Sequence, residues 1–288
     1  MRAGASSQRG SVLLVLGGIV SVQCGAAVAI GLFDDVGPGG TVFLRVAISA
    51  LLLIAIWRPS IPGADRPSVR RDVVAFGLVL AGMNFSFYEA LDRIPLGIAV
   101  TLEFIGPLGV AVLRSRRRLD LAWAGLAALG ILLLSPLPGG SLDLLGMALA
   151  LLAGAFWGAY IVLAARLGEA FTGGRGLALA MAVGAIVLIP VGIAQGGSQV
   201  IGGGVLLAGV GVAILSSAIH YSLEMEALRR LPEGVFGVLM SIEPAVAALV
   251  GFVGLSQDLS LREVIAIGFV LAASAGALSS SADPPAEA

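Results

Sequence analysis

Two stretches of this sequence follow one pattern, and they lie 137 positions apart. Residues 88–107 read YEALDRIPLGIAVTLEFIGP, and residues 225–244 read MEALRRLPEGVFGVLMSIEP. The matching positions are Glu89, Ala90, Leu91, Arg93, Pro95, Gly97 and Pro107 in the first copy, and Glu226, Ala227, Leu228, Arg230, Pro232, Gly234 and Pro244 in the second. In each copy an apolar run ends in a charged turn, a proline follows, and a second apolar run carries a glutamate. Because the chain has 288 residues, this spacing indicates a duplication of about half of it.

The sequence around the two copies contains few charges. Charged residues make up 12% of the chain and hydrophobic residues 58%, with a mean hydropathy of +1.02. Since a soluble domain carries about 25% charged residues, we expect an integral membrane protein whose main surroundings are the lipid bilayer. The net charge of −1 does not favour a nucleic-acid partner. Cys24 is the single cysteine of the sequence, so an intrachain disulfide is excluded.

Ten apolar runs reach or approach the length of about 20 residues that a membrane-spanning helix needs. They cover residues 12–32, 39–57, 72–92, 95–113, 119–136, 142–165, 175–194, 203–228, 232–254 and 261–280. The strands of a membrane barrel would be about half as long and would alternate in polarity. The first run exceeds the apolar part of a signal peptide, so we expect it to be retained. The sequence therefore predicts an all-α membrane protein with ten transmembrane helices.

The arginines predict the orientation of these helices. If the N-terminus lies inside, fourteen arginines fall on inner segments, whereas Arg93 and Arg262 fall outside and Arg45 lies within the second span. This bias places both termini in the cytoplasm. Five spans per half is an odd number, so the second half enters the membrane inverted relative to the first. The expected parts are a cytoplasmic N-terminus 1–11, a five-helix repeat 12–137, a second repeat 138–281 and a cytoplasmic tail 282–288.

Each copy of the repeated stretch carries a glutamate deep in its second apolar run. Glu103 and Glu243 lie about 12 and 16 Å along their helices from the preceding prolines, at a rise of 1.5 Å per residue. A charged group at this depth is costly, which suggests that it binds a cationic substrate group or a proton. The alternative is a protonated glutamate hydrogen-bonded to a neighbouring helix. Glu103 aligns with Met240 and Glu243 with Gly106, so we expect the two glutamates to have different roles.

Two further acidic residues precede an arginine by four positions. Glu89 precedes Arg93, and Glu226 precedes Arg230, each near a predicted helix end. This order favours an ion pair on a helix. We expect structural pairs, with symmetric gates on opposite faces of the membrane as the alternative.

The remaining polar candidates are spread over several spans. His220 and Glu224 are four positions apart, but one histidine and no second ligand pair argue against a metal site. We expect them instead to form a polar face toward a cavity. Other side chains suited to packing or to lining such a cavity are Gln23, Asn84, Tyr88, Trp157, Tyr160 and Tyr221. We expect Arg45 to face the bundle or to extend toward an interface. Phosphate-binding and dinucleotide motifs are missing from the sequence, so no cofactor is expected.

Four segments of the sequence resemble the EamA-type proteins of the drug/metabolite transporter superfamily. They are GMNFSFYEAL (82–91), IPLGIAVTLEFIGPLGVAVL (94–113), AILSSAIHYSLEMEALRRLP (213–232) and FGVLMSIEPAVAAL (236–249), and the loop RSRRRLD (114–120) is similar too. Within that superfamily the resemblance is sharpest to the inner-membrane exporters of threonine and homoserine. It implies that the chain exports small neutral amino acids by alternating access in exchange for protons. Glu103, Glu224 and Glu243 match acidic positions of the pattern.

Other functions are compatible with parts of the sequence. An exporter of drugs, nucleosides or cationic metabolites would use the same aromatic and acidic groups. An intramembrane enzyme acting on lipid would need a nucleophile beside His220 and Glu224, and none stands at a motif spacing. A channel is less compatible with an inverted repeat that carries carboxylates at mid-depth. We therefore expect a transporter and not an enzyme.

Overall fold

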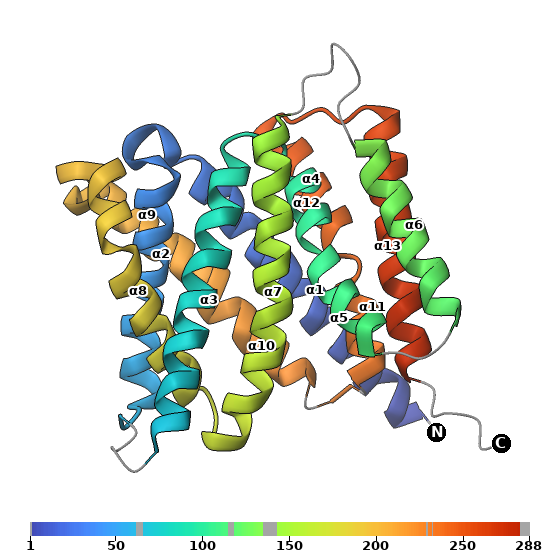
Figure 1. Ribbon diagram of the computed structural model, residues 1–288, viewed down its shortest axis with the longest axis horizontal. Coiled ribbons are helices and arrows are strands. Elements are labelled where there is room, and N and C mark those ends of the chain that lie inside the picture. The colour runs from blue at the N-terminus through green and yellow to red at the C-terminus, as the bar shows by residue number, and fades with distance from the viewer. Residues whose placement is uncertain are drawn as a thin grey trace.

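The computed structural model describes residues 2–61, 66–114, 118–134, 143–228, 230–231 and 233–282. In these residues the chain forms helices and short connections (Figure 1). The first half contains α1 (Arg2–Ile30), α2 (Phe33–Trp57), α3 (Pro67–Leu91), α4 (Leu96–Glu103), α5 (Ile105–Arg114) and α6 (Arg118–Leu134). The second half contains α7 (Leu144–Ala170), α8 (Arg175–Gly196), η1 (Gly197–Ile201), α9 (Gly203–Ala213), the π-helical η2 (Ile214–Ile219), α10 (His220–Leu228), α11 (Glu233–Met240), α12 (Glu243–Leu255) and α13 (Leu261–Ala282).

Helix occupies each of the ten predicted ranges in the described part of the chain. The two largest differences lie at helix starts. α1 begins at Arg2, although the span was predicted from residue 12. α2 begins at Phe33 and not at residue 39, because its first turn precedes a kink at Gly37, whose φ of 69° interrupts the helix before Pro38. The residues of the predicted tail after position 282 lie outside the described residues.

The described helices confirm an all-α membrane protein. Seven of the described segments are long and apolar enough to cross a membrane, namely Gly10–Ile30, Phe33–Trp57, Pro67–Leu91, Leu144–Ala170, Arg175–Ile201, Gly203–Glu224 and Val238–Leu255. Leu96–Val110 and Leu121–Leu134 are shorter apolar helices. Large apolar side chains such as Leu51, Ile186, Leu207 and Val253 are exposed on the outside. A water-soluble monomer rarely presents such a surface, whereas lipid accommodates it.

The helices stand side by side in one bundle. In Figure 1, α8 and α9 lie at one end of the long axis and α6 and α13 at the other, with α7 in front of the centre. The principal contacts pair α2 with α8, α3 with α7, α6 with α13, α1 with α10 and α4 with α12. Helices from the first half therefore pack mainly against helices from the second half. The start of α1 and the end of α13 lie on the same side of the bundle.

Small residues on α7 allow the closest of these helix contacts. Gly154 lies against the backbone of Glu103, and a Cβ atom there would come within 2.6 Å of the Glu103 carbonyl oxygen. From the other side, a Cβ on Gly106 would lie 1.8 Å from the carbonyl oxygen of Gly154. The small residues on this face of α7 thus let the two backbones approach closely.

Candidate functional site

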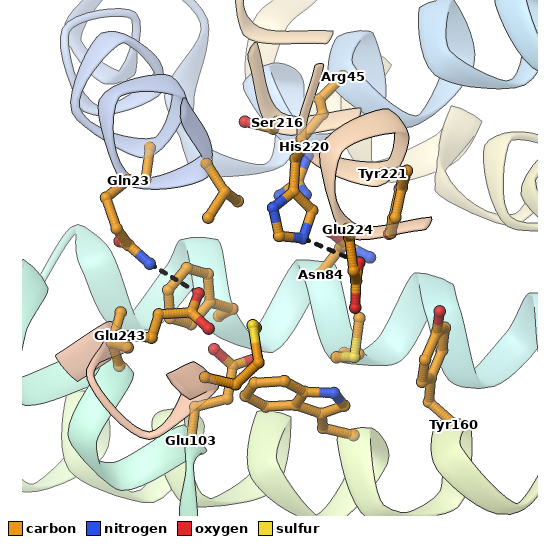
Figure 2. Close-up of a pocket in the computed structure, with 17 residues that line it drawn as sticks. Gln23, Arg45, Asn84, Glu103, Tyr160, Ser216, His220, Tyr221, Glu224 and Glu243 are labelled. Atoms are coloured by element: carbon orange, nitrogen blue, oxygen red, sulfur yellow. Dashed lines mark hydrogen bonds and ion pairs between the residues drawn. The ribbon is translucent and has the colours of Figure 1, made fainter. Parts of the chain in front are cut away.

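A cavity of about 130 Å³ lies between helices of both halves (Figure 2). Side chains from both chain halves surround it. The lining residues are Val22, Gln23, Ala26, Arg45, Met83, Asn84, Phe87, Val100, Glu103, Trp157, Tyr160, Ser216, His220, Tyr221, Glu224, Met240 and Glu243. Nine of the ten residues predicted to bind substrate or protons are among them. The tenth, Tyr88, is fully buried and is not a lining residue.

Breaks in two helices bring the deep glutamates to this cavity. α4 ends at Glu103 and α5 starts at Ile105, while α11 ends at Met240 and α12 starts at Glu243. The two breaks occupy equivalent positions in the repeated stretch. In both, a proline follows within four residues and lacks the N–H that would continue the helical hydrogen bonding. Glu103 thus approaches its break from the N-terminal side, and Glu243 approaches its break from the C-terminal side.

Glu243 has a partner on α1. The Nε2 atom of Gln23 donates a hydrogen bond of 2.9 Å to Oε1 of Glu243, and both side chains are buried. Two oxygens of this pair are buried and have no hydrogen-bond partner among the described residues. They are Oε1 of the Gln23 amide and Oε2 of the Glu243 carboxyl group. The pair therefore presents two unused acceptors.

His220 connects α1, α10 and the cavity. Its Nδ1 atom lies 3.0 Å from the carbonyl oxygen of Gly18, which can only accept, so Nδ1 is the donor. Its Nε2 atom lies 3.4 Å from Oε2 of Glu224 (Figure 2). That contact is favourable when either partner carries a proton. The spacing of four residues thus forms the predicted polar face.

Arg45 is a lining residue that the sequence did not assign to the site, although it was expected to face the bundle. Its Nη1 atom donates to the hydroxyl oxygen of Tyr88 at 3.3 Å, and the guanidinium carbon lies 5.5 Å from the centre of the Tyr88 ring. Tyr88 therefore holds Arg45 and does not itself line the cavity. A charge in the middle of an apolar helix was the signal that could have placed Arg45 in the site.

The aromatic candidates line the cavity and pack at the same time. Trp157 meets Phe104 edge to face, with ring centroids 5.0 Å apart. The ring centroids of Tyr160 and Phe76 are also 5.0 Å apart. Tyr221 lies 5.2 Å from His220. Both expected roles, packing and lining, therefore hold for these side chains.

Asn84 and several apolar lining residues complete the wall. The Nδ2 atom of Asn84 donates to the carbonyl oxygen of Leu80 at 2.8 Å. Apolar lining residues had no polar group to single them out in the sequence. Met83 and Phe87 nevertheless share the helix face of Asn84 by their spacing.

The two predicted Glu–Arg pairs have different outcomes. Glu226 and Arg230 form the pair, with Nε of Arg230 donating to Oε1 of Glu226 at 2.8 Å. The pairing of Glu89 with Arg93 was wrong. Glu89 instead accepts a 2.8 Å hydrogen bond from Nε2 of Gln195 on α8. The local turns are alike, so the difference comes from the partners that neighbouring helices offer.

Arg93 has its own partner at the start of α7. Its Nη1 atom lies 3.6 Å from Oδ2 of Asp143, the N-cap residue of that helix. Oδ1 of Asp143 accepts from the backbone N–H groups of Leu145 and Gly146 at 2.7 and 3.0 Å. The Gly146 hydrogen bond, then that of Leu145 and the Arg93 charge, hold the pKa of Asp143 below its usual value.

Comparisons with known proteins agree on one group. The EamA-like transporter family matches residues 144–279. The chain is 42% identical over 267 residues to the threonine/homoserine exporter RhtA of Escherichia coli (strain K12), covering 92% of this chain and 90% of that protein. It is 43% identical, with the same coverage, to RhtA of Salmonella typhimurium (strain LT2). A crystal structure of another protein matches 93% of this chain and 96% of its own with a TM-score of 0.61 at 21% identity, so the fold is shared.

Proposed function

This chain belongs to the EamA-like transporter family, and we propose that it exports small neutral amino acids such as threonine and homoserine across the cytoplasmic membrane. It is a multi-pass membrane transporter and not an enzyme. The relatives that match most of its length are named threonine/homoserine exporters. The proposed cycle is alternating access with exchange of substrate for protons.

The observation that carries this proposal is the charge content of the cavity. Three carboxyl groups, of Glu103, Glu224 and Glu243, line it together with the guanidinium of Arg45. A zwitterion needs an anion for its ammonium group and a donor for its carboxylate, and the cavity offers both. If all three carboxyl groups ionise, they outnumber the guanidinium by two charges, which a proton or an ammonium group would offset.

The size of the cavity favours a small substrate over a drug. Its volume of about 130 Å³ is well below the roughly 300–1,000 Å³ of pockets that hold drug-sized ligands. Polar groups at several points of the wall suit a compact polar molecule. Drugs, nucleosides and larger cationic metabolites therefore fit this site less well than an amino acid.

The packing of the helices supports ten spans arranged as two inverted repeats, 12–137 and 138–281. If α7 corresponds to α1 and α10 to α3, the contact of α3 with α7 recurs as the contact of α10 with α1. At the offset of the repeat, α9 and α10 together correspond to α3, α8 corresponds to α2, and α12 corresponds to α5. The contact of α5 with α7 then recurs as that of α12 with α1, and the contact of α3 with α8 recurs as that of α9 with α2. Contacts that repeat after exchange of the halves are expected of a pseudo-twofold fold. The arginine bias and this arrangement together support the proposal that both termini lie in the cytoplasm.

Exchange follows if proton and substrate compete for one carboxylate. In this scheme Glu243 binds the ammonium group when the cavity faces the cytoplasm and a proton when it faces outward. Because either cation satisfies the same group, the carboxylate crosses the membrane occupied in both directions. Substrate leaves and protons enter without a further coupling element.

Counterflow in proteoliposomes tests the proposal. Vesicles that contain the full chain and are loaded with threonine or homoserine should accumulate the radiolabelled form of the same amino acid. Vesicles loaded with a nucleoside or a cationic drug should not accumulate the radiolabelled form of that compound. Glu243→Gln should nearly abolish export driven by a pH gradient while the protein still inserts. Unchanged export by this variant in pH-clamped vesicles would exclude Glu243 as the coupling group. Exchange of nucleosides or drugs but not of amino acids would exclude small neutral amino acids as the substrate class.

A further inference from the structure

We propose that the cavity has two fixed poles, an ammonium pole formed by Gln23 with Glu243 and a carboxylate pole formed by Arg45. This assignment rests on the proposed function and adds to it which end of the substrate each side chain takes. The poles come from different helices, since Gln23 lies on α1, Glu243 on α12 and Arg45 on α2. In Figure 2, Gln23 and Glu243 point toward each other on one side of the cavity, whereas Arg45 enters from the top of the view.

The ammonium pole follows from a surplus of acceptors. Gln23 is 3% exposed and Glu243 is 7% exposed, and Nε2 of Gln23 donates a hydrogen bond to Oε1 of Glu243. Two buried oxygens, Oε1 of Gln23 and Oε2 of Glu243, have no partner in the described residues. A buried acceptor without a donor costs about 1–3 kcal/mol. An ammonium group carries three donors and no acceptor, so its chemistry matches a group of unpartnered acceptors.

Gln23 also determines how Glu243 presents its charge. Its Nε2 atom donates to Oε1 of Glu243 at 2.9 Å, and Oε2 remains without a hydrogen-bond partner in the described residues. The glutamine therefore positions the carboxylate and supplies an acceptor of its own. Glu103 lines the same cavity and adds negative potential, which further favours a cation.

The carboxylate pole follows from an unpaired cation. Arg45 lines the cavity, and no carboxylate of the described residues lies within ion-pair distance of its guanidinium. Its hydrogen bond to the Tyr88 hydroxyl uses one of five N–H donors. The Tyr88 ring, at 5.5 Å, also limits the movement of the guanidinium. A planar guanidinium with free donors matches the two oxygens of a carboxylate.

Two poles held by separate helices predict a requirement for both charged groups of the ligand. An amine without a carboxylate leaves Arg45 unpaired, and an acid without an ammonium group leaves the oxygens of Gln23 and Glu243 unsatisfied. Each loss leaves buried polar groups without partners, which discriminates strongly between ligands. The two poles thus select α-amino acids, while the wall between them accommodates the substrate side chain.

Competition binding with purified full-length protein tests both poles. Radiolabelled threonine is the probe, and the competitors are 1-amino-2-propanol, which lacks the carboxylate, and 2,3-dihydroxybutanoate, which has a hydroxyl in place of the ammonium group. Arg45→Gln should weaken threonine binding on the order of 30-fold or more and change inhibition by the amine less than about threefold. Glu243→Gln should weaken the binding of threonine and of the amine, and leave inhibition by the hydroxy acid within about threefold.

Arg45→Lys keeps the charge but not the fork of donors, so its threonine affinity should lie between those of the wild type and Arg45→Gln. Arg166→Gln and Glu169→Gln are matched controls, because both side chains are exposed near the end of α7. Each variant is checked for a single gel-filtration peak. If the wild type does not bind threonine, the proposed function fails. If it binds threonine but Arg45→Gln weakens the amine as much as threonine, or Glu243→Gln weakens the hydroxy acid as much, the assignment of the poles is wrong.

Discussion

The two copies of the repeated stretch have nearly the same backbone but different surroundings. In the first, the N–H groups of Arg93 and Ile94 both donate to Ala90 at 2.9 Å, and in the second those of Arg230 and Leu231 both donate to Ala227 at 2.9 Å. The helices that follow, α4 and α11, each contain eight residues and break at equivalent positions. The local sequence therefore specifies the turn and the break twice.

The side chains of the two copies differ because their neighbours differ. Glu89 bonds to Gln195 of α8, whereas Glu226 pairs with Arg230 in its own copy. After the break, Gly106 of the first copy packs against the backbone of α7, and the equivalent Glu243 faces the cavity. A duplicated scaffold can thus hold an asymmetric site, since each copy meets different helices at the same positions.

The largest expected effect concerns the first copy, in which Gly106 packs against α7. Gly106→Ala should lower the free energy of unfolding by about 3 kcal/mol, the upper range for overpacking, because the new Cβ would lie 1.8 Å from the Gly154 carbonyl oxygen. Gly109→Ala on the same helix is the control, since a Cβ there meets nothing within 4 Å. Unfolding of the purified proteins in detergent, followed by tryptophan fluorescence, measures both. Similar unfolding midpoints for the two variants would contradict the close contact of Gly106 with the backbone of α7.

The second effect concerns the glutamates on either side of the breaks. Glu243→Gln should slow threonine export driven by a pH gradient on the order of 100-fold and remove its dependence on pH. Glu103 has no hydrogen bond to another side chain in the described residues, so Glu103→Gln should slow export only about 10-fold and retain the pH dependence. Initial rates in proteoliposomes between pH 6 and 8 compare them. Equal loss of pH dependence in both variants would show that the glutamates share one role.

The positions of the helices and their breaks could be predicted from the sequence. The contacts between residues far apart in the chain could not. Apolar runs and prolines predicted the positions of the helices, because length and helix breaking depend on neighbouring residues. Depth in an apolar run was enough to single out Glu103 and Glu243. The contact of Gln23 with Glu243 joins residues 220 positions apart, and Gln195 meets Glu89 across 106 positions. Such partners depend on how the helices pack, which no local pattern in one sequence contains.

The third effect compares the partners of the two equivalent glutamates, Glu89 and Glu226. Gln195 joins three helices, because its Oε1 atom accepts from the N–H of Gly39 at 2.6 Å while its Nε2 atom donates to Glu89. Gln195→Ala should therefore cost about 1 kcal/mol of unfolding free energy. Arg230→Ala removes an exposed contact within one copy and should cost less than about 0.5 kcal/mol. Thermal unfolding of both variants tests the order, and a larger cost for Arg230→Ala would reverse this view of the two copies.

The smallest effect separates the ion pair of Arg93 from the N-cap of α7. The pKa of Asp143 is lowered in the folded protein, so its stabilising contribution is complete above the unfolded pKa of about 3.9 and is lost as the pH falls through the lower folded value. Asp143→Asn keeps an N-cap side chain without the charge. The wild type should therefore unfold at a higher temperature than Asp143→Asn at pH 6, and this advantage should shrink as the pH falls toward 3.

Arg93→Gln tells the two causes apart. The backbone N–H of Gly146 contributes most to the lowered pKa of Asp143, and the charge of Arg93 contributes less. Between pH 6 and pH 3 the wild type should lose more stability than Asp143→Asn does. Arg93→Gln should show most of that extra loss. If Arg93→Gln removes that pH dependence as completely as Asp143→Asn does, the ion pair and not the helix cap anchors the turn of the first copy to α7. The first copy would then differ from the second by a salt bridge between helices, where the second has one within its own stretch.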